Sequence, residues 1–143
     1  MPGKSNYLET AVLNHIFRTA TLSKPSNVYV SLHTADPTDA ATANELTIGS
    51  NGYTRVAVSS ADASWSAPAD SGDAKQITNA AAITFGTPTG DWASGNPITH
   101  FGIWDASSSG NLLYSGALGT SRTVLNGDNA PSFAIGALAI QES

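Results

Sequence analysis

The chain contains no cysteine, which excludes disulfide bonds, thiolate catalysis and cysteine-ligated zinc. Charge is also scarce: Asp, Glu, Lys and Arg make up 12% of its 143 residues, whereas soluble domains carry about 25%. The six Lys and Arg residues are scattered singly, and the formal net charge is −5. Because no basic patch forms, we expect neither a nucleic acid nor an acidic membrane surface as a partner.

Long hydrophobic runs are missing as well. No apolar segment approaches the roughly 20 residues that a membrane-spanning helix needs, and the N-terminus lacks the apolar stretch of a signal peptide. We therefore expect synthesis in the cytoplasm of the producing cell and a soluble product. The length favours a single domain over residues 1–143, and a domain of this size buries enough surface to support its own core.

Motifs that carry catalysis or bind phosphate are lacking too. There is no nucleophile elbow of the G-x-S-x-G type and no glycine-rich phosphate loop. Carboxylates are spread over the loops, so no glycosidase pair stands out. A Ser-His-Asp triad is recognised by geometry and stays open at this point. We expect a protein that is not an enzyme, with no catalytic, cofactor-binding or metal-binding residues and no cofactor.

The three histidines, His15, His33 and His100, do not lie at the spacing of paired metal ligands. His33 lies near Asp36 in sequence and His100 near Asp105, and the favoured interpretation of both is a partly buried histidine in a hydrogen bond. The loop after residue 33 holds three carboxylates of the kind that binds Ca²⁺, Asp36, Asp39 and Glu45. Their spacing is not that of a calcium-binding EF-hand, which disfavours a calcium site.

What is present begins with an amphipathic helix at about residues 6–20. Ser5 or Asn6 can cap it, and Glu9 follows Asn6 as in a capping box. A wide apolar arc follows at helical spacing, formed by Leu8, Ala11, Val12, Leu13, Ile16, Phe17 and Ala20. We predict that this arc packs on the protein's own sheet, so that Leu8→Asp and Ile16→Asp both destabilise the fold. The alternative is a subunit interface.

After Pro25 the pattern changes to the alternation of strands, in a β-rich body over about residues 27–141. The expected strands are Val28–Leu32, Tyr53–Val58, Ile77–Asn79 with Ala81–Phe85 as one broken strand, Ile98–Asp105, Leu112–Leu118, Arg122–Leu125 and Phe133–Ile140. A turn at residues 107–111 predicts that the strands on either side of it form an antiparallel hairpin. The fold class is mainly β: a single antiparallel sandwich or barrel-like domain with one N-terminal helix.

Two long neutral loops, Thr34–Asn51 and Ser59–Lys75, separate the first strands. Loops of this length lose entropy when they are ordered, and we expect a partner surface to stabilise them. Trp65 is expected to fold back onto the core. Both faces of Ile98–Asp105 carry large apolar groups, which is typical of a central strand or of a strand covered by a partner. Trp104 is therefore predicted to be more than half buried, within the domain or across a subunit boundary.

Five segments of the chain together resemble a known family. They read NYLETAVLNHIFRTATLSKPSNVYVSLHTADPTD at 6–39, GYTRVAV at 52–58, TNAAAITFGTPTGDW at 78–92, ITHFGIWDASSSGNLLYSGAL at 98–118 and FAIGALAI at 133–140. The NHIFR segment with the strand after it, and the THFGIWDA…GNLLY hairpin, carry most of the likeness. The chain resembles the short virion structural proteins of tailed bacteriophages that are commonly labelled tail fibre proteins. The resemblance implies a virion component and carries over no catalytic residues.

Three functions compete on these observations. The leading expectation is a capsid decoration or cement protein, a homotrimer that binds and stabilises the major capsid shell, because a chain without coiled coil or repeats suits a compact accessory. The alternative is a tail or tail-fibre subunit involved in host attachment, with tail proteins of the same phage as partners. The remote alternative is a glycan-degrading enzyme. Low charge and small side chains favour close packing against other subunits, and repeated contacts gain from avidity.

Overall fold

A computed structural model describes residues 3–142. Ten short strands, one α-helix and one 3₁₀ turn make up the described chain. In chain order they are β1 (Gly3–Lys4), α1 (Asn6–Phe17), β2 (Asn27–His33), β3 (Val56–Ser59), β4 (Ala69–Ser71), β5 (Ala74–Thr78), β6 (Ile83–Thr84), the 3₁₀ turn (Trp92–Gly95), β7 (Ile98–Trp104), β8 (Leu112–Arg122), β9 (Ser132–Phe133) and β10 (Ala139–Glu142).

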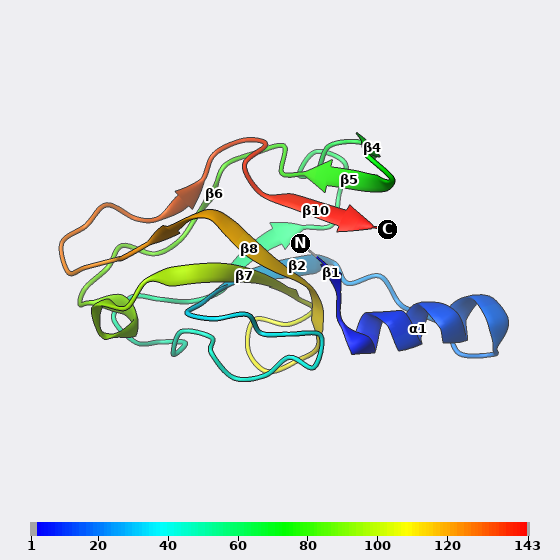
Figure 1. Ribbon diagram of the computed structural model, residues 1–143, viewed down its shortest axis with the longest axis horizontal. Coiled ribbons are helices and arrows are strands. Elements are labelled where there is room, and N and C mark those ends of the chain that lie inside the picture. Colours follow the sequence, from blue (N-terminus) through cyan, green and yellow to red (C-terminus); the bar gives the residue numbers. More distant parts are fainter. Residues whose placement is uncertain (1–2, 143) are drawn as a thin grey trace.

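The strands form three antiparallel sheets in two layers (Figure 1). The large sheet has the order β1-β8-β7-β2-β3, and the second layer holds a three-stranded sheet, β10-β5-β4, and the pair β6-β9. Each sheet is open, with unpaired strands at its edges. The predicted β-rich fold with an N-terminal helix is confirmed, and it takes the sandwich form, because no sheet closes into a barrel.

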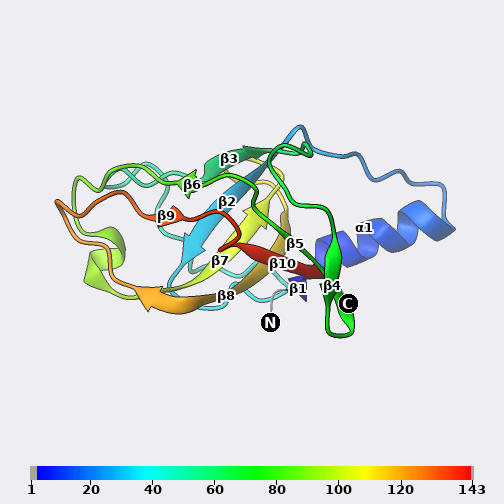
Figure 2. The ribbon, with the colours of Figure 1, turned by 90° about the horizontal axis from the view of Figure 1, so that it is seen from above.

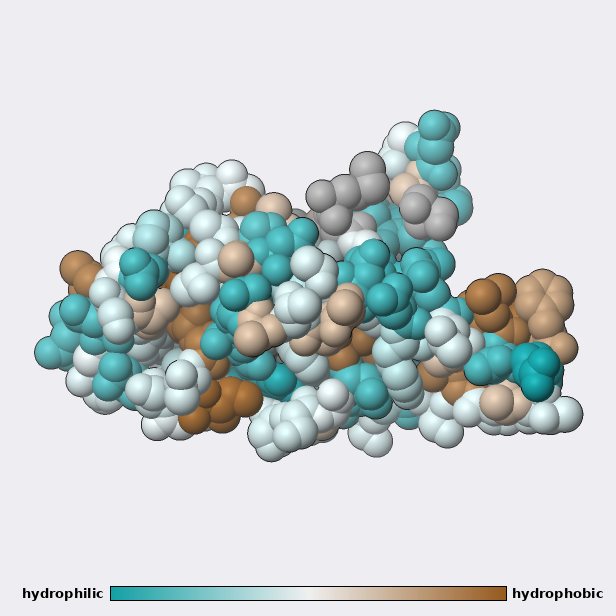
Figure 3. Space-filling view, turned by 60° about the horizontal axis from the view of Figure 1, so that its bottom comes forward, coloured by the Kyte–Doolittle hydropathy of each residue, from teal (hydrophilic) through white to brown (hydrophobic). Residues whose placement is uncertain are grey.

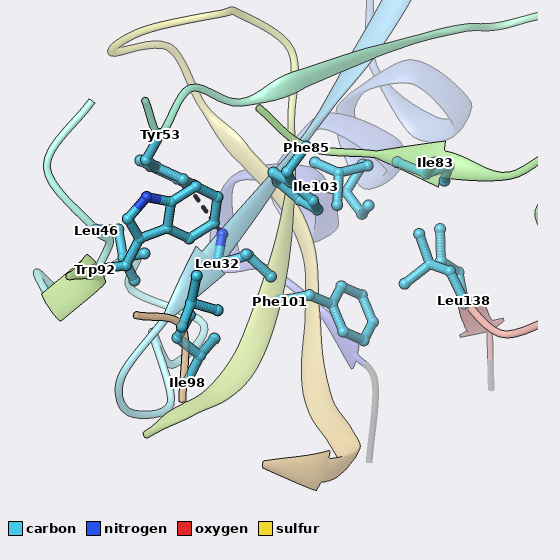
Figure 4. Packing of buried hydrophobic residues seen from close by; sticks show 13 residues of the cluster. Leu32, Leu46, Tyr53, Ile83, Phe85, Trp92, Ile98, Phe101, Ile103 and Leu138 are labelled. Atoms are coloured by element: carbon cyan, nitrogen blue, oxygen red, sulfur yellow. Dashed lines mark hydrogen bonds between the residues drawn. The ribbon is translucent and has the colours of Figure 1, made fainter. Parts of the chain in front are cut away.

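The hydrophobic core lies between the two layers. Alternation along β2 and β7 directs Val30, Leu32, Phe101 and Ile103 to this side, where they meet Ile83, Phe85, Leu138 and Ile140 from the second layer. Figure 4 shows these side chains interleaved, with Tyr53 and Trp92 closing one end of the core. The Tyr53 hydroxyl accepts a hydrogen bond from the Leu32 amide at 3.0 Å, so the residue after the long first loop is fixed to a core strand.

The strongest alternating segments are found where the sequence predicts them. β2, β7 and β8 match the expected strands, and β7 pairs with β8 across the predicted turn at residues 107–111. β7 lies between β2 and β8 in the centre of the large sheet, and Trp104 is only 8% exposed, so both predictions for this strand are confirmed. Trp65 packs partly against the core, as expected.

Several weaker expectations are wrong in detail. The segment 77–85 is two strands in different sheets, β5 and β6, and the closing segment 133–140 is divided between β9 and β10. Of the expected strand Arg122–Leu125, only Arg122 lies in a strand, as the last residue of β8, and residues 123–125 are irregular. The loop Ser59–Lys75 contains β4, which pairs with β5. These segments are short and rich in Ala, Ser and Thr, so the apolar pattern is too weak to show where a strand changes sheets.

The helix projects beyond the sheets as an arm (Figures 1 and 2). We use "the arm" for residues 6–26, that is α1 together with the segment 18–26 that leads back to β2. Ser5 is the N-cap: its hydroxyl accepts a hydrogen bond from the Leu8 amide at 3.2 Å and donates to the Leu112 carbonyl. Within residues 3–142, no helix has the length and apolar character that crossing a membrane requires.

The predicted packing of the whole apolar arc on the sheet is wrong. Leu8 is buried, but Leu13, Ile16 and Phe17 are 58%, 62% and 77% exposed. Only the first part of α1 reaches β1 and β8, because the helix runs past the edge of the sheet. The helix also ends at Phe17, earlier than the expected boundary near residue 20. Half of the arc therefore serves the fold, and the other half is a surface.

A pair of substitutions separates the two halves of the arc. Leu8→Asp places a charge in a buried site, and we expect it to lower the free energy of unfolding by more than about 2 kcal/mol. Ile16→Asp alters an exposed side chain, and we expect a change within about 0.5 kcal/mol. Urea denaturation of both variants measures the difference. Equal destabilisation would show that Ile16 is packed in the folded protein.

Candidate functional site

One structured surface lies on the outer face of the large sheet. Alternation along β2 places Ser31 and His33 on the side opposite to Val30 and Leu32, away from the main core. The loop between β2 and β3 and the turn between β7 and β8 fold over this outer face and bury it. The side chain of Arg55 connects this loop to this turn.

Arg55 uses every nitrogen of its guanidinium group. Nε and Nη2 donate to the two carboxylate oxygens of Glu45, at 2.8 and 2.7 Å, in a bidentate pair. Nη1 donates to the carbonyl oxygens of Ala106 and Ser109, at 2.8 and 2.9 Å. The guanidinium carbon also lies 3.9 Å from the ring centre of Trp104, a cation–π contact. One side chain thus holds both loops to the sheet.

Beneath Arg55, a second group of polar side chains is fully enclosed. Ser31 Oγ accepts a hydrogen bond from Trp104 Nε1 at 2.8 Å and lies 2.7 Å from His33 Nε2. Gly102 lies across from Ser31 in the neighbouring strand, and a Cβ there would come within 2.6 Å of Ser31 Oγ and 2.9 Å of His33 Nε2. The glycine therefore leaves the room that this packed group of side chains occupies.

The pKa of His33 is lowered from 6.5 to about 4, chiefly by burial. Within this net shift, the carboxylates of Glu45 and Asp36 act to raise the pKa, and Arg55 and His100 act to lower it. His33 is consequently neutral in the folded protein near pH 7. In the unfolded chain His33 is protonated below about pH 6.5, whereas in the folded chain it is protonated only below about pH 4. The free energy of unfolding therefore decreases as the pH falls from 6.5 to 4.

We therefore predict a loss of stability between pH 6.5 and pH 4 that depends on His33. The expected penalty on the acid side is about 3 kcal/mol, on the scale of 1.36 kcal/mol per pKa unit. The free energy of unfolding, measured by urea denaturation across this range, should fall less steeply in His33→Gln than in the natural chain. His15→Gln is the control, because His15 lies on the exposed arm. Parallel curves for His33→Gln and the natural chain would contradict the assignment.

The first long loop is ordered by contacts within the chain. Its residue Leu46 is buried in the core, and its backbone bonds to β2 through the Leu46 amide and the Leu32 carbonyl. The expectation that a partner must order Thr34–Asn51 is therefore wrong, because Glu45 and Tyr53 already hold this loop on the chain's own sheet. The second loop is likewise partly ordered through β4.

The other residues considered for chemistry lie apart. Asp36 accepts a hydrogen bond from the Thr38 amide within the loop, whereas Glu45 binds Arg55, so these two carboxylates have partners on the same chain. Asp105 bonds to Asn111 rather than to His100, and His33 bonds to Ser31 rather than to Asp36. Among residues 3–142, no group of three or more His, Asp or Glu side chains is placed to hold a metal ion.

The arm carries the second structured surface. Leu13, Ile16 and Phe17 occupy positions i, i+3 and i+4 of α1 and form one exposed apolar face, followed directly by Arg18. We call these four residues the arm tip. In the space-filling view, apolar side chains gather at the end of the molecule where α1 ends (Figure 3). The sequence revealed this apolar face but not its exposure, because a broad arc is consistent with either a core or an interface.

An apolar groove lies beside the base of the arm, between the large sheet and β5 and β10. It encloses about 730 Å³, and we call it the root groove. Its larger apolar lining residues include Val28, Trp65, Ile77, Leu113, Tyr114 and Ile140. At one end, Glu142 binds Lys4 at 2.5 Å and accepts a hydrogen bond from the Tyr114 hydroxyl at 2.7 Å. Burial and Glu142 together raise the pKa of Tyr114, so its hydroxyl stays protonated near neutral pH.

Sequence reasoning missed Arg55 and the root groove. Arg55 follows a threonine at the start of a strand, and nothing in its neighbourhood signals that it meets Glu45 and the turn after β7. The groove is assembled from β2, β5, β8 and β10, which are distant in sequence. Neither feature has a local pattern; both depend on which strands become neighbours.

Comparison with known protein families gives one match. The family model described as podophage GP4 fiber I protein gp80 matches residues 3–141, which is nearly the whole chain. A search of curated proteins finds no match. The family match agrees with the resemblance to phage tail fibre proteins that the five sequence segments show. The chain therefore belongs to the family of the podophage GP4 fiber I protein gp80, and it is a structural protein of a phage virion.

Proposed function

We propose that this protein is a subunit of a phage tail fibre, with a role in host attachment. The observation that carries the proposal is the family match over residues 3–141, since the family is that of a fibre protein. The family favours this function over capsid decoration, the leading expectation from the sequence. It also favours a structural role over an enzymatic one.

The structure supports a binding role in two ways. The body is tied together by the core and by Arg55, which keeps its surface loops in one arrangement. The arm tip offers apolar side chains that gain free energy when another surface covers them. We propose that residues 1–143 act as one domain, that the partners are tail proteins of the same phage, and that the subunit self-associates as a homotrimer.

Particles that lack this protein test the proposal. A fibre subunit predicts that such particles adsorb poorly to the host while their capsids resist heat as well as complete particles do. A capsid cement protein predicts the reverse, because a protein that binds only the assembled shell stabilises it by mass action. Adsorption and heat inactivation are measured on the same two preparations. Normal adsorption together with a heat-sensitive capsid would contradict the fibre assignment.

A further inference from the structure

We infer that the arm tip of one copy seats in the root groove of a second copy, and that this contact holds the subunits together. The inference deepens the proposed self-association and rests on it. It does not depend on where in the virion the subunit lies.

The first step is the shape of the two surfaces. Leu13, Ile16 and Phe17 have the i, i+3, i+4 spacing by which an amphipathic helix anchors in an apolar groove. The root groove, of about 730 Å³, offers aromatic and aliphatic side chains such as Trp65 and Ile77, and it is open to solvent. A helix face without a cover and a groove without an occupant are therefore present on the same chain.

The second step is charge. The arm tip ends in Arg18, and the rim of the root groove carries Asp62. Within the part of the chain that the structure describes, neither residue belongs to an ion pair. At the start of the same helix face lies Glu9, and the groove rim also carries Lys24. The groove also carries Glu142 and Lys75, but these pair with Lys4 and Asp70 on their own chain. Apart from them, the helix and the groove each carry one acid and one base that the other can match, which favours one orientation.

The third step is reach. The twelve residues of α1 extend about 18 Å at 1.5 Å per residue, while Ser5 fixes the first turn to β8. The tip is thus held away from its own body at a fixed angle. A contact between two different patches of identical chains is heterologous, and it closes into a ring when the rotation between copies allows. A ring of three copies fits the proposed homotrimer.

The test uses the purified full chain and measures its mass in solution over a range of concentrations. The natural chain should be an oligomer. In the arm variant Ile16→Ser/Phe17→Ser, we expect self-association to weaken by about thirtyfold or more, as for the central residues of an interface. Ile135→Ser is the matched control, because Ile135 is 71% exposed in a turn outside the arm and the groove. We expect this control variant to remain oligomeric.

Two groove variants, Ala67→Arg and Ala61→Arg, place a bulky charged side chain at exposed positions that line the groove. Each should also weaken self-association while its far-UV circular dichroism spectrum matches that of the natural chain, which shows that the fold is intact. Mixing the arm variant with a groove variant should restore association, since one intact tip then meets one intact groove. Oligomers that persist in both kinds of variant, or a mixture that stays monomeric, would contradict the proposed contact between arm tip and root groove but not self-association itself. A monomeric natural chain would overturn both the contact and the proposed self-association.

Discussion

Replacing Arg55 by leucine should lower the free energy of unfolding by about 3–5 kcal/mol, the cost of removing one partner from a buried ion pair. The Arg55 side chain is 3% exposed and that of Glu45 is 17% exposed, so the carboxylate left behind is largely shielded from water. The carbonyl groups of Ala106 and Ser109 lose their donor as well. Urea denaturation followed by tryptophan fluorescence measures the effect.

Two controls separate the charge from the side chain's bulk. The double variant Arg55→Leu/Glu45→Leu leaves no lone charge, and we expect it to be more stable than Arg55→Leu. Arg122→Leu removes an exposed arginine from the end of β8, and it should change stability within about 0.5 kcal/mol. If Arg55→Leu were as stable as Arg122→Leu, Arg55 would not be what holds the two loops.

The second large effect is expected for Trp92→Ala. Trp92 is 2% exposed, its ring contacts Tyr53 edge-on with 5.4 Å between ring centres, and its Nε1 donates to the Asn51 carbonyl at 2.7 Å. Truncation leaves a large cavity and removes one of the two hydrogen bonds that the Asn51 carbonyl accepts, the other coming from the Thr89 amide, and we expect a loss of about 3–5 kcal/mol. The same denaturation experiment measures it.

Trp65→Ala is the matched control for the core position. Trp65 is only partly buried against the core, and its Nε1 donates to the Ser59 carbonyl at 3.1 Å. Its truncation removes less buried apolar area, so the loss should be clearly smaller than for Trp92→Ala. Equal losses would mean that the end of the core around Tyr53 and Trp92 is not as tightly packed as the structure has it.

The sequence predicts the centre of the large sheet well. β2, β7 and β8 have apolar alternation or large side chains on both faces, and the turn between β7 and β8 has the residues of a hairpin. These signals lie in consecutive residues, so they can be recognised without knowing which strands pair in the sheet. The burial of Trp104 follows in the same way, because a central strand with large groups on both faces is covered twice.

The arm shows where such reasoning stops. An apolar arc on a helix predicts that something covers it, but the pattern does not say what. Leu8 is buried inside the chain and Ala11 and Val12 are partly buried, while Ile16 and Phe17 extend past the sheet edge. The contact between Arg55 and Glu45 on the outer face could not be predicted for a related reason. It depends on the path of the loop between β2 and β3, which carries no periodic signal.

These features divide the molecule by task. The core and the Arg55 network hold the body in one arrangement, and the arm presents exposed apolar side chains that we propose a neighbouring subunit covers. The proposed fibre subunit needs both properties, because each subunit must stay folded while its surface contacts the next.

The position of this protein in the virion tests the central proposal most directly. Cryo-electron microscopy of complete particles and of particles without the protein gives a difference density. The account predicts that this difference lies at the tail, with a shape that accommodates the two-layered body and its projecting arm. Difference density spread over the capsid shell, with none at the tail, would contradict it.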